Sequence, residues 1–165
     1  MSPDEKVKKE IIKNFGYAYR AFGLNKLMGS VVALLLCSNE PLSLDEIAKT
    51  LARSKGPISQ ITRRLRDKNL IRRVWHPTSR KDFYEIQPEI FENAFRNNFE
   101  LIKSNTRLAK QLNYLVTEVS SDHDFLSTRL AEMQLFYEIM EKHYQNFLDE
   151  WTIERIKLLN NKENK

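Results

Sequence analysis

Residues 43–87 read SLDEIAKTLARSKGPISQITRRLRDKNLIRRVWHPTSRKDFYEIQ, and this stretch decides the fold of the chain. At its start, Ser43 and Glu46 have the spacing of a capping box, in which each side chain accepts a hydrogen bond from the other residue's backbone N–H. A capping box marks the first turn of a helix, so the sequence predicts a short helix that ends at about Leu51.

A second helix is predicted from Lys55 to Lys68, with Ser54 as its N-cap. Apolar residues recur in it at helical spacing, which is typical of one buried face. They are Ile58, Ile61 and Leu65. The other faces of this helix carry polar and basic residues, namely Ser59, Gln60, Arg63 and Arg64.

A β-hairpin should follow the second helix. Asn69 can adopt the left-handed conformation that ends a helix, and residues 70–75 are β-branched and aromatic enough for a strand. Residues 76–82 predict a polar turn, and residues 83–87 return as a second strand that ends at Pro88. Two helices followed by a hairpin with a basic tip are typical of a winged helix-turn-helix.

Positive charge is concentrated in the same stretch. Residues 43–82 hold eleven Lys or Arg and four Asp or Glu, a net charge of +7, whereas the whole chain carries +5. Such a local basic surface favours nucleic acid as the partner, because polar and basic side chains on a helix reach base edges and cations on a wing meet phosphates. We predict DNA contacts from Ser54, Lys55, Ser59, Gln60, Arg63, Arg64, Thr78, Ser79, Arg80 and Lys81. Asp82 is interpreted as a partner that orients a wing arginine.

Helices are also predicted before this domain. A first helix should run from Pro3 to about Phe22, with Gly23 as its C-terminal stop. Asn25 then caps a second, largely buried helix, which residues 38–41 interrupt.

Beyond Pro88 the sequence predicts two long helices, because turn residues first recur at Ser120 and a last helix starts near Ser121 or Asp122. Apolar residues in the last helix alternate in spacing between four and three, as in a helix that packs along another helix of the same chain or of a partner subunit. We predict that they form the seam of a homodimer: Leu126, Leu130, Met133, Tyr137, Met140, Tyr144, Phe147 and Trp151.

The predicted fold class is mainly α with a small β-hairpin wing, a winged helix-turn-helix with N- and C-terminal dimerisation helices. Residues 1–23 are assigned to the N-terminal dimerisation helix, residues 24–88 to the DNA-binding domain, and residues 89–165 to the long C-terminal dimerisation helices.

The sequence resembles the GbsR-like branch of the MarR family of winged helix-turn-helix transcriptional regulators. The resemblance lies in EPLSLDEIA (residues 40–48), SKG (54–56), LIRRVW (70–75) and RKDFY (80–84), and it covers residues 24–87. The flanking helices match only in length and layout. Pro57 departs from the pattern, since a polar residue is expected there; it is tolerable in a first helical turn but removes one backbone or side-chain contact to DNA.

The resemblance implies a sequence-specific transcriptional regulator, a repressor, that reads a near-palindromic operator as a homodimer and is often relieved by a small-molecule effector. The alternative is an architectural or protein-binding winged-helix module without a specific operator. An enzyme is not expected, because the sequence has no phosphate-binding glycine loop, no metal-binding pair of histidines and no nucleophile elbow.

No cofactor is expected either. His76, His123 and His143 lack metal-ligand spacing, and Cys37 is interpreted as structural rather than as a redox sensor. Aromatic residues could line a pocket for a cationic effector, although their helical spacing favours core and interface positions. These residues are Phe15, Tyr17, Tyr19, Phe22, Trp75, Phe95, Tyr137, Tyr144 and Trp151.

A cytoplasmic location without membrane contact is expected from two features. The longest apolar run, residues 31–37, is too short to span a membrane, which takes about 20 residues. The first residues, MSPDE, lack the basic and then apolar order of a signal peptide.

Overall fold

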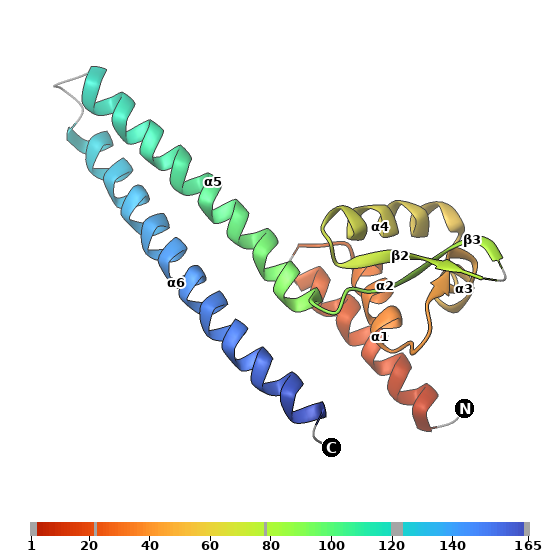
Figure 1. Ribbon diagram of the computed structural model, residues 1–165. Helices are drawn as coiled ribbons and strands as arrows, with labels where there is room; N and C mark the ends of the chain where they lie inside the picture. Colours follow the sequence, from red (N-terminus) through yellow and green to blue (C-terminus); the bar gives the residue numbers. More distant parts are fainter. Residues whose placement is uncertain (1–2, 22, 78, 120–123, 164–165) are drawn as a thin grey trace. The chain divides into compact units, whose positions relative to one another are not determined.

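The computed structural model describes residues 3–21, 23–77, 79–119 and 124–163 (Figure 1). It divides into an N-terminal unit, Met1–Ala94, and a C-terminal unit, Phe95–Lys165, and each is described by itself. The elements in chain order are α1 (Pro3–Ala21), α2 (Lys26–Leu36), β1 (Leu42–Ser43), α3 (Leu44–Thr50), α4 (Lys55–Asp67), β2 (Ile71–His76), β3 (Ser79–Ile86), α5 (Ile90–Val119) and α6 (Asp124–Glu163).

The N-terminal unit is built around α2, whose residues from Met28 to Leu35 are almost all buried. Side chains from α3, α4 and β2 close around it, and several of them are completely buried. The largest of these are Ile47, Ile58, Leu65 and Ile71, and Leu34 of α2 is equally buried. This arrangement confirms the predicted winged helix-turn-helix, a mostly helical fold with a small antiparallel sheet.

The α1 helix packs directly on α2. Ile12, Phe15 and Tyr19 of α1 contact the buried core, so the apolar face of this helix is used within its own unit. Gly29 makes the close approach feasible, because a Cβ atom there would lie only 2.5 Å from the backbone oxygen of Phe15 and 2.8 Å from Cγ of Tyr19.

Most helix boundaries follow the predicted caps. The Ser43 capping box forms, since the Ser43 N–H donates to Glu46 Oε2 at 2.7 Å and the Glu46 N–H donates to Ser43 Oγ at 3.3 Å. Asn69 has a positive φ of 55° and ends α4. Ser54 occupies the N-cap position of α4, but within the described part of the chain its side chain makes no capping hydrogen bond.

The sheet differs from the prediction in two ways. It has three strands in the order β1-β3-β2, and the two-residue strand β1 was not predicted. The second wing strand begins at Ser79 rather than at Phe83, so residues 79–82 belong to a strand and not to the turn. The pairing of β2 with β3 is irregular here, and an irregular strand loses the alternation of apolar and polar residues. Without that alternation, the polar residues 79–82 resembled a turn. Thr78 lies outside the described residues.

In the C-terminal unit, α5 and α6 run in opposite directions and pack along each other (Figure 1). Phe95 stacks on Tyr144 with ring centroids 4.5 Å apart, and the amide of Asn113 donates to Gln134 at 2.9 Å. The predicted start of the last helix at Ser121 or Asp122 falls outside the described residues. No helix in the described ranges is long and apolar enough to cross a membrane.

The Gly29→Ala variant should be less stable than the natural chain by about 1–3 kcal/mol, because its new methyl group overlaps α1. Gly56→Ala is the matched control, since a Cβ atom at Gly56 would meet nothing within 4 Å. Urea unfolding followed by circular dichroism measures the free energy of unfolding of both variants. Equal stability of the two variants would contradict the close α1–α2 contact.

Candidate nucleic-acid interface

The α4 helix has one buried and one exposed face. Ile58, Ile61 and Leu65 are buried in the core of the N-terminal unit. Because residues three, four and seven apart lie on the same side of a helix, Gln60, Arg63 and Arg64 fall on the opposite side. All three are exposed, while Ser59 is half-buried at the edge of that face. The structure thus presents a glutamine and two arginines together.

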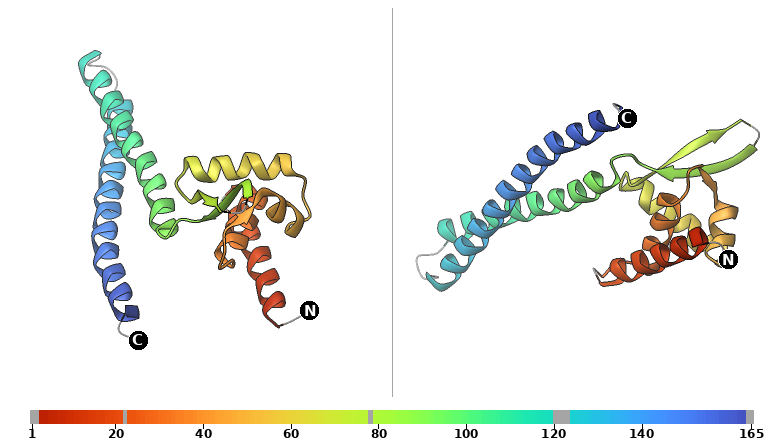
Figure 2. Two further views of the ribbon diagram at one scale, coloured as in Figure 1. Left: turned by 45° about the vertical axis from the view of Figure 1, so that its right-hand side comes forward. Right: turned by 90° about the horizontal axis from the view of Figure 1, so that it is seen from below.

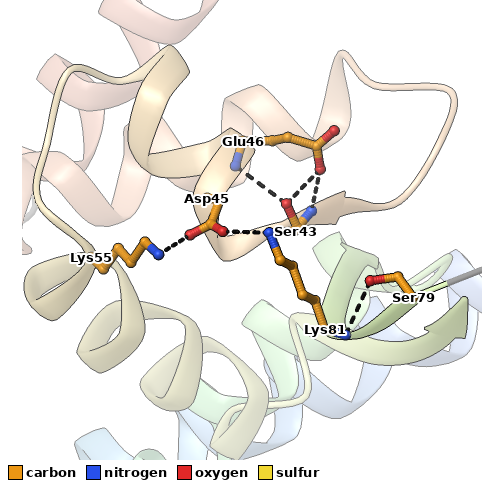
Figure 3. Close-up of polar contacts among 6 residues, drawn as sticks. All are labelled: Ser43, Asp45, Glu46, Lys55, Ser79 and Lys81. Atoms are coloured by element: carbon orange, nitrogen blue, oxygen red, sulfur yellow. Dashed lines mark hydrogen bonds and ion pairs between the residues drawn. The ribbon is translucent and has the colours of Figure 1, made fainter.

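Asp45 joins three elements at one end of this surface (Figure 3). It lies in the first turn of α3, and its Oδ1 atom is 2.5 Å from Nζ of Lys55 at the start of α4. Its Oδ2 atom accepts a hydrogen bond at 2.8 Å from Nζ of Lys81 in β3. The carboxylate therefore holds the ammonium groups of Lys55 on α4 and of Lys81 on the wing close to each other.

The two lysines change the acidity of Asp45. Hydrogen bonding from Lys55 and then from Lys81 lowers the pKa of the Asp45 carboxyl to about 2. Conversely, the hydrogen bond to Asp45 raises the pKa of Lys81. At neutral pH the cluster therefore holds two ammonium groups around one carboxylate and keeps a net positive charge, with 65% and 70% of the side chains of Lys81 and Lys55 exposed.

The wing carries two further ion pairs. Nε of Arg73 lies 3.2 Å from Oδ1 of Asp82, which confirms that Asp82 pairs with a wing arginine. Arg72 donates from Nε to Glu85 at 2.6 Å, across the β2–β3 pair. Arg80 is exposed on β3.

The structure places the predicted contact residues in two groups. The first group lies along α4 and at its N-cap and contains Ser54, Lys55, Ser59, Gln60, Arg63 and Arg64. The second group lies in β3 rather than at a hairpin tip and contains Ser79, Arg80 and Lys81. The β2–β3 hairpin extends beyond the helices of its unit, so the second group lies on a projecting element (Figure 2).

Two residues of this surface were not predicted as part of it. Asp45 gave no signal in the sequence, because its partners are 10 and 36 positions away and meet it only in the fold. Trp75 was grouped with aromatic residues of a pocket, the core or an interface, but its side chain is 80% exposed. A core position is therefore wrong for Trp75.

Known proteins similar to this chain are regulators of transcription. No family model matches the chain. It is 25% identical over 151 residues to the HTH-type transcriptional repressor OpcR of Bacillus subtilis strain 168, covering 87% of this chain and 81% of OpcR. It is 25% identical over 114 residues to the putative HTH-type transcriptional regulator YvaV of the same organism, covering 66% of this chain and 64% of YvaV. The homologues are HTH-type transcriptional regulators and not enzymes.

A solved structure agrees with this result. The crystal structure of a transcriptional regulator matches 88% of this chain and 97% of its own, with a TM-score of 0.73 and 25% identity. MepR of Staphylococcus aureus and MarR of E. coli match with TM-scores of 0.42 and 0.41 only. The resemblance to the GbsR-like branch stays a prediction.

The Asp45 carboxyl should titrate near pH 2 in a carbon-detected NMR titration. Since this pKa is below the ordinary value, the two ion pairs contribute stability at neutral pH and lose it as the pH falls through about 2. Lys55→Met and Lys81→Met should each raise the midpoint of Asp45. Arg73→Met removes a cation of the same wing that pairs with Asp82, and it should leave the midpoint unchanged. A titration midpoint of Asp45 near 3.8 in the natural chain would contradict its ion pairs with Lys55 and Lys81.

Proposed function

We propose that the protein is a sequence-specific DNA-binding transcriptional regulator of the GbsR-like branch of the MarR family, acting as a repressor on a near-palindromic operator. The observation that carries the proposal is the exposed face of α4, where Gln60, Arg63 and Arg64 lie together above a buried apolar face. The name of OpcR, a repressor, supports the direction of regulation. Relief of repression by a small-molecule effector stays a prediction from the resemblance.

The two groups of contact residues have different roles in this proposal. Arginine and glutamine side chains on a helix in the major groove form paired hydrogen bonds with guanine and adenine edges, which distinguish base pairs. Lys55, Arg80 and Lys81 bind phosphates, which fixes the position of the protein on the duplex without reading the sequence. The Asp45 bridge, formed by its ion pairs with Lys55 and Lys81, brings the two lysines of this set, one from α4 and one from the wing, to the same place.

The proposal includes a homodimer formed by the C-terminal unit. Among its described residues, Phe99, Thr106, Ala109 and Leu148 are buried, which is a small core for two helices of 30 and 40 residues. The predicted seam faces α5 of the same chain at Tyr137 and Tyr144. The seam residues Leu126 and Phe147 remain 44% and 48% exposed, and other large apolar side chains on α6 are more exposed still.

These exposed side chains favour a second subunit as their partner. Leu135, Phe136 and Ile139 are 58%, 60% and 49% exposed on α6. A helix with apolar residues on more than one side needs more than one packing partner, and α5 supplies one. A two-fold dimer supplies another and also repeats the α4 surface, as a near-palindromic site requires.

Arg63→Ala and Arg64→Ala should each weaken binding to a selected duplex by about 1–3 kcal/mol and bind random-sequence DNA almost normally, because a base-edge contact is lost. Arg80→Ala should weaken binding to both duplexes alike and reduce the salt dependence by about one phosphate contact. Fluorescence anisotropy at several salt concentrations measures all of these effects.

Equal losses on both duplexes for all three variants would contradict this division of roles. A natural chain that binds DNA but shows little preference among duplexes would support the alternative, an architectural module without an operator.

The natural chain should sediment at twice the 19.6 kDa mass of one chain. The double variant Phe136→Ser, Ile139→Ser should shift the sedimentation profile toward the single-chain mass, because it removes apolar area from the proposed interface. Leu36→Ser is the matched control, since Leu36 is 39% exposed on α2 and lies outside the predicted dimerisation helices. A natural chain of single mass, or a double variant that dimerises normally, would contradict the proposed interface.

A further inference from the structure

Trp75 is unusual for a surface residue. Its side chain is 80% exposed, the highest value for a large apolar side chain in the described parts of the chain. Tryptophan has a large apolar ring system, and it is enriched where proteins bind partners. An indole left this exposed on a projecting hairpin therefore indicates a contact surface.

The wing backbone is irregular at this residue. Val74 pairs with Phe83, and His76 pairs with Ser79. Between these two pairs β2 has one residue, Trp75, whereas β3 has three, residues 80–82. Bulges of this kind redirect a side chain and occur next to functional sites.

The surroundings of Trp75 indicate the chemistry of its partner. The β3 segment opposite it contains Arg80, Lys81 and Asp82, and Arg73, two residues earlier in β2, pairs with Asp82. The three cations outnumber the one carboxylate, so the surface combines one flat apolar ring with a net positive charge. Such a combination fits a polyanion that also has apolar faces, as DNA does through its deoxyribose rings and bases.

We propose that Trp75 contacts DNA directly, with its indole against the deoxyribose walls of the minor groove beside the wing, while Arg80 and Lys81 bind the flanking phosphates. This inference rests on the proposed DNA-binding function and adds an apolar contact to it. The irregular part of the hairpin thus supplies an apolar contact, which a regular wing with only basic side chains would lack.

The two tryptophans of the chain, Trp75 and Trp151, allow a direct test. Trp151→Phe leaves Trp75 as the only indole, and Trp75→Phe leaves Trp151, whose ring nitrogen is buried in the C-terminal unit. Acrylamide is the quencher because it is neutral, so the charge of DNA does not repel it. Adding duplex DNA should lower the acrylamide quenching constant of Trp75 about threefold or more and leave that of Trp151 unchanged.

Heparin separates a charge effect from a groove contact. It is a polyanion that binds cationic wings but has no minor groove, so Trp75 should remain open to acrylamide when heparin is bound. Equal protection by heparin and by DNA would overturn the groove contact.

Binding affinity gives a second readout that does not depend on the single-tryptophan variants. Trp75→Ala should weaken binding to every duplex about tenfold, as expected for the loss of an aromatic contact. Trp75→Phe should retain most of the affinity. Leu36→Ala is the matched control, because Leu36 is 39% exposed on α2 of the same unit and lies outside the wing and the predicted dimerisation helices, and it should bind normally.

The two proposals fail in different ways. If the natural chain does not bind DNA, the proposed function fails and this inference fails with it. If the natural chain binds DNA while Trp75 stays open to acrylamide and Trp75→Ala binds normally, the inference alone is overturned.

Discussion

Ile58, Ile61 and Leu65 bury one face of α4 against α2, α3 and β2, and the rest of the candidate interface depends on this packing. The helix has 3.6 residues per turn, so fixing these three positions also fixes which side chains face outward. Gln60, Arg63 and Arg64 are consequently presented as a group on a rigid support. Burial of a fully enclosed Ile or Leu side chain stabilises the folded state by about 1.5–3 kcal/mol, which is more than an exposed ion pair contributes.

The Asp45 bridge fixes the positions of Lys55 and Lys81 but adds little to the stability of the fold. Exposed ion pairs contribute little to stability because water screens them, and both lysines remain largely exposed. Their importance is that α3, α4 and β3 meet at one carboxylate, which holds a cation of the helix beside a cation of the wing (Figure 3). The same carboxylate also removes one positive charge from the cluster, which in the proposed function reduces attraction to DNA of any sequence.

Local signals were sufficient for much of the fold. The Ser43–Glu46 capping box, the left-handed Asn69 and the apolar spacing in α4 each depend on residues close in sequence, and all three were predicted correctly. The start of β3 was predicted wrongly because the irregular pairing opposite Trp75 disturbs the strand pattern. The role of Asp45 depends on contacts between elements that are distant in sequence, which a local sequence pattern does not reveal. The exposure of Trp75 likewise depends on which other elements cover it in the fold. The apolar residues spaced four and three apart in α6 were predicted as the seam of a homodimer, and two of them, Tyr137 and Tyr144, contact α5 of the same chain. Their contact with a second subunit stays a prediction.

In the proposed function, the exposed face of α4 reads the sequence of DNA. Selection of bound duplexes from a random pool, followed by sequencing, tests it most directly, because the operator sequence emerges from the selection itself. We expect an enriched near-palindromic sequence whose half-sites lie about one helical turn apart, roughly 10–10.5 base pairs from centre to centre. A bound pool that retains the random composition of the starting pool would show that α4 does not read the sequence.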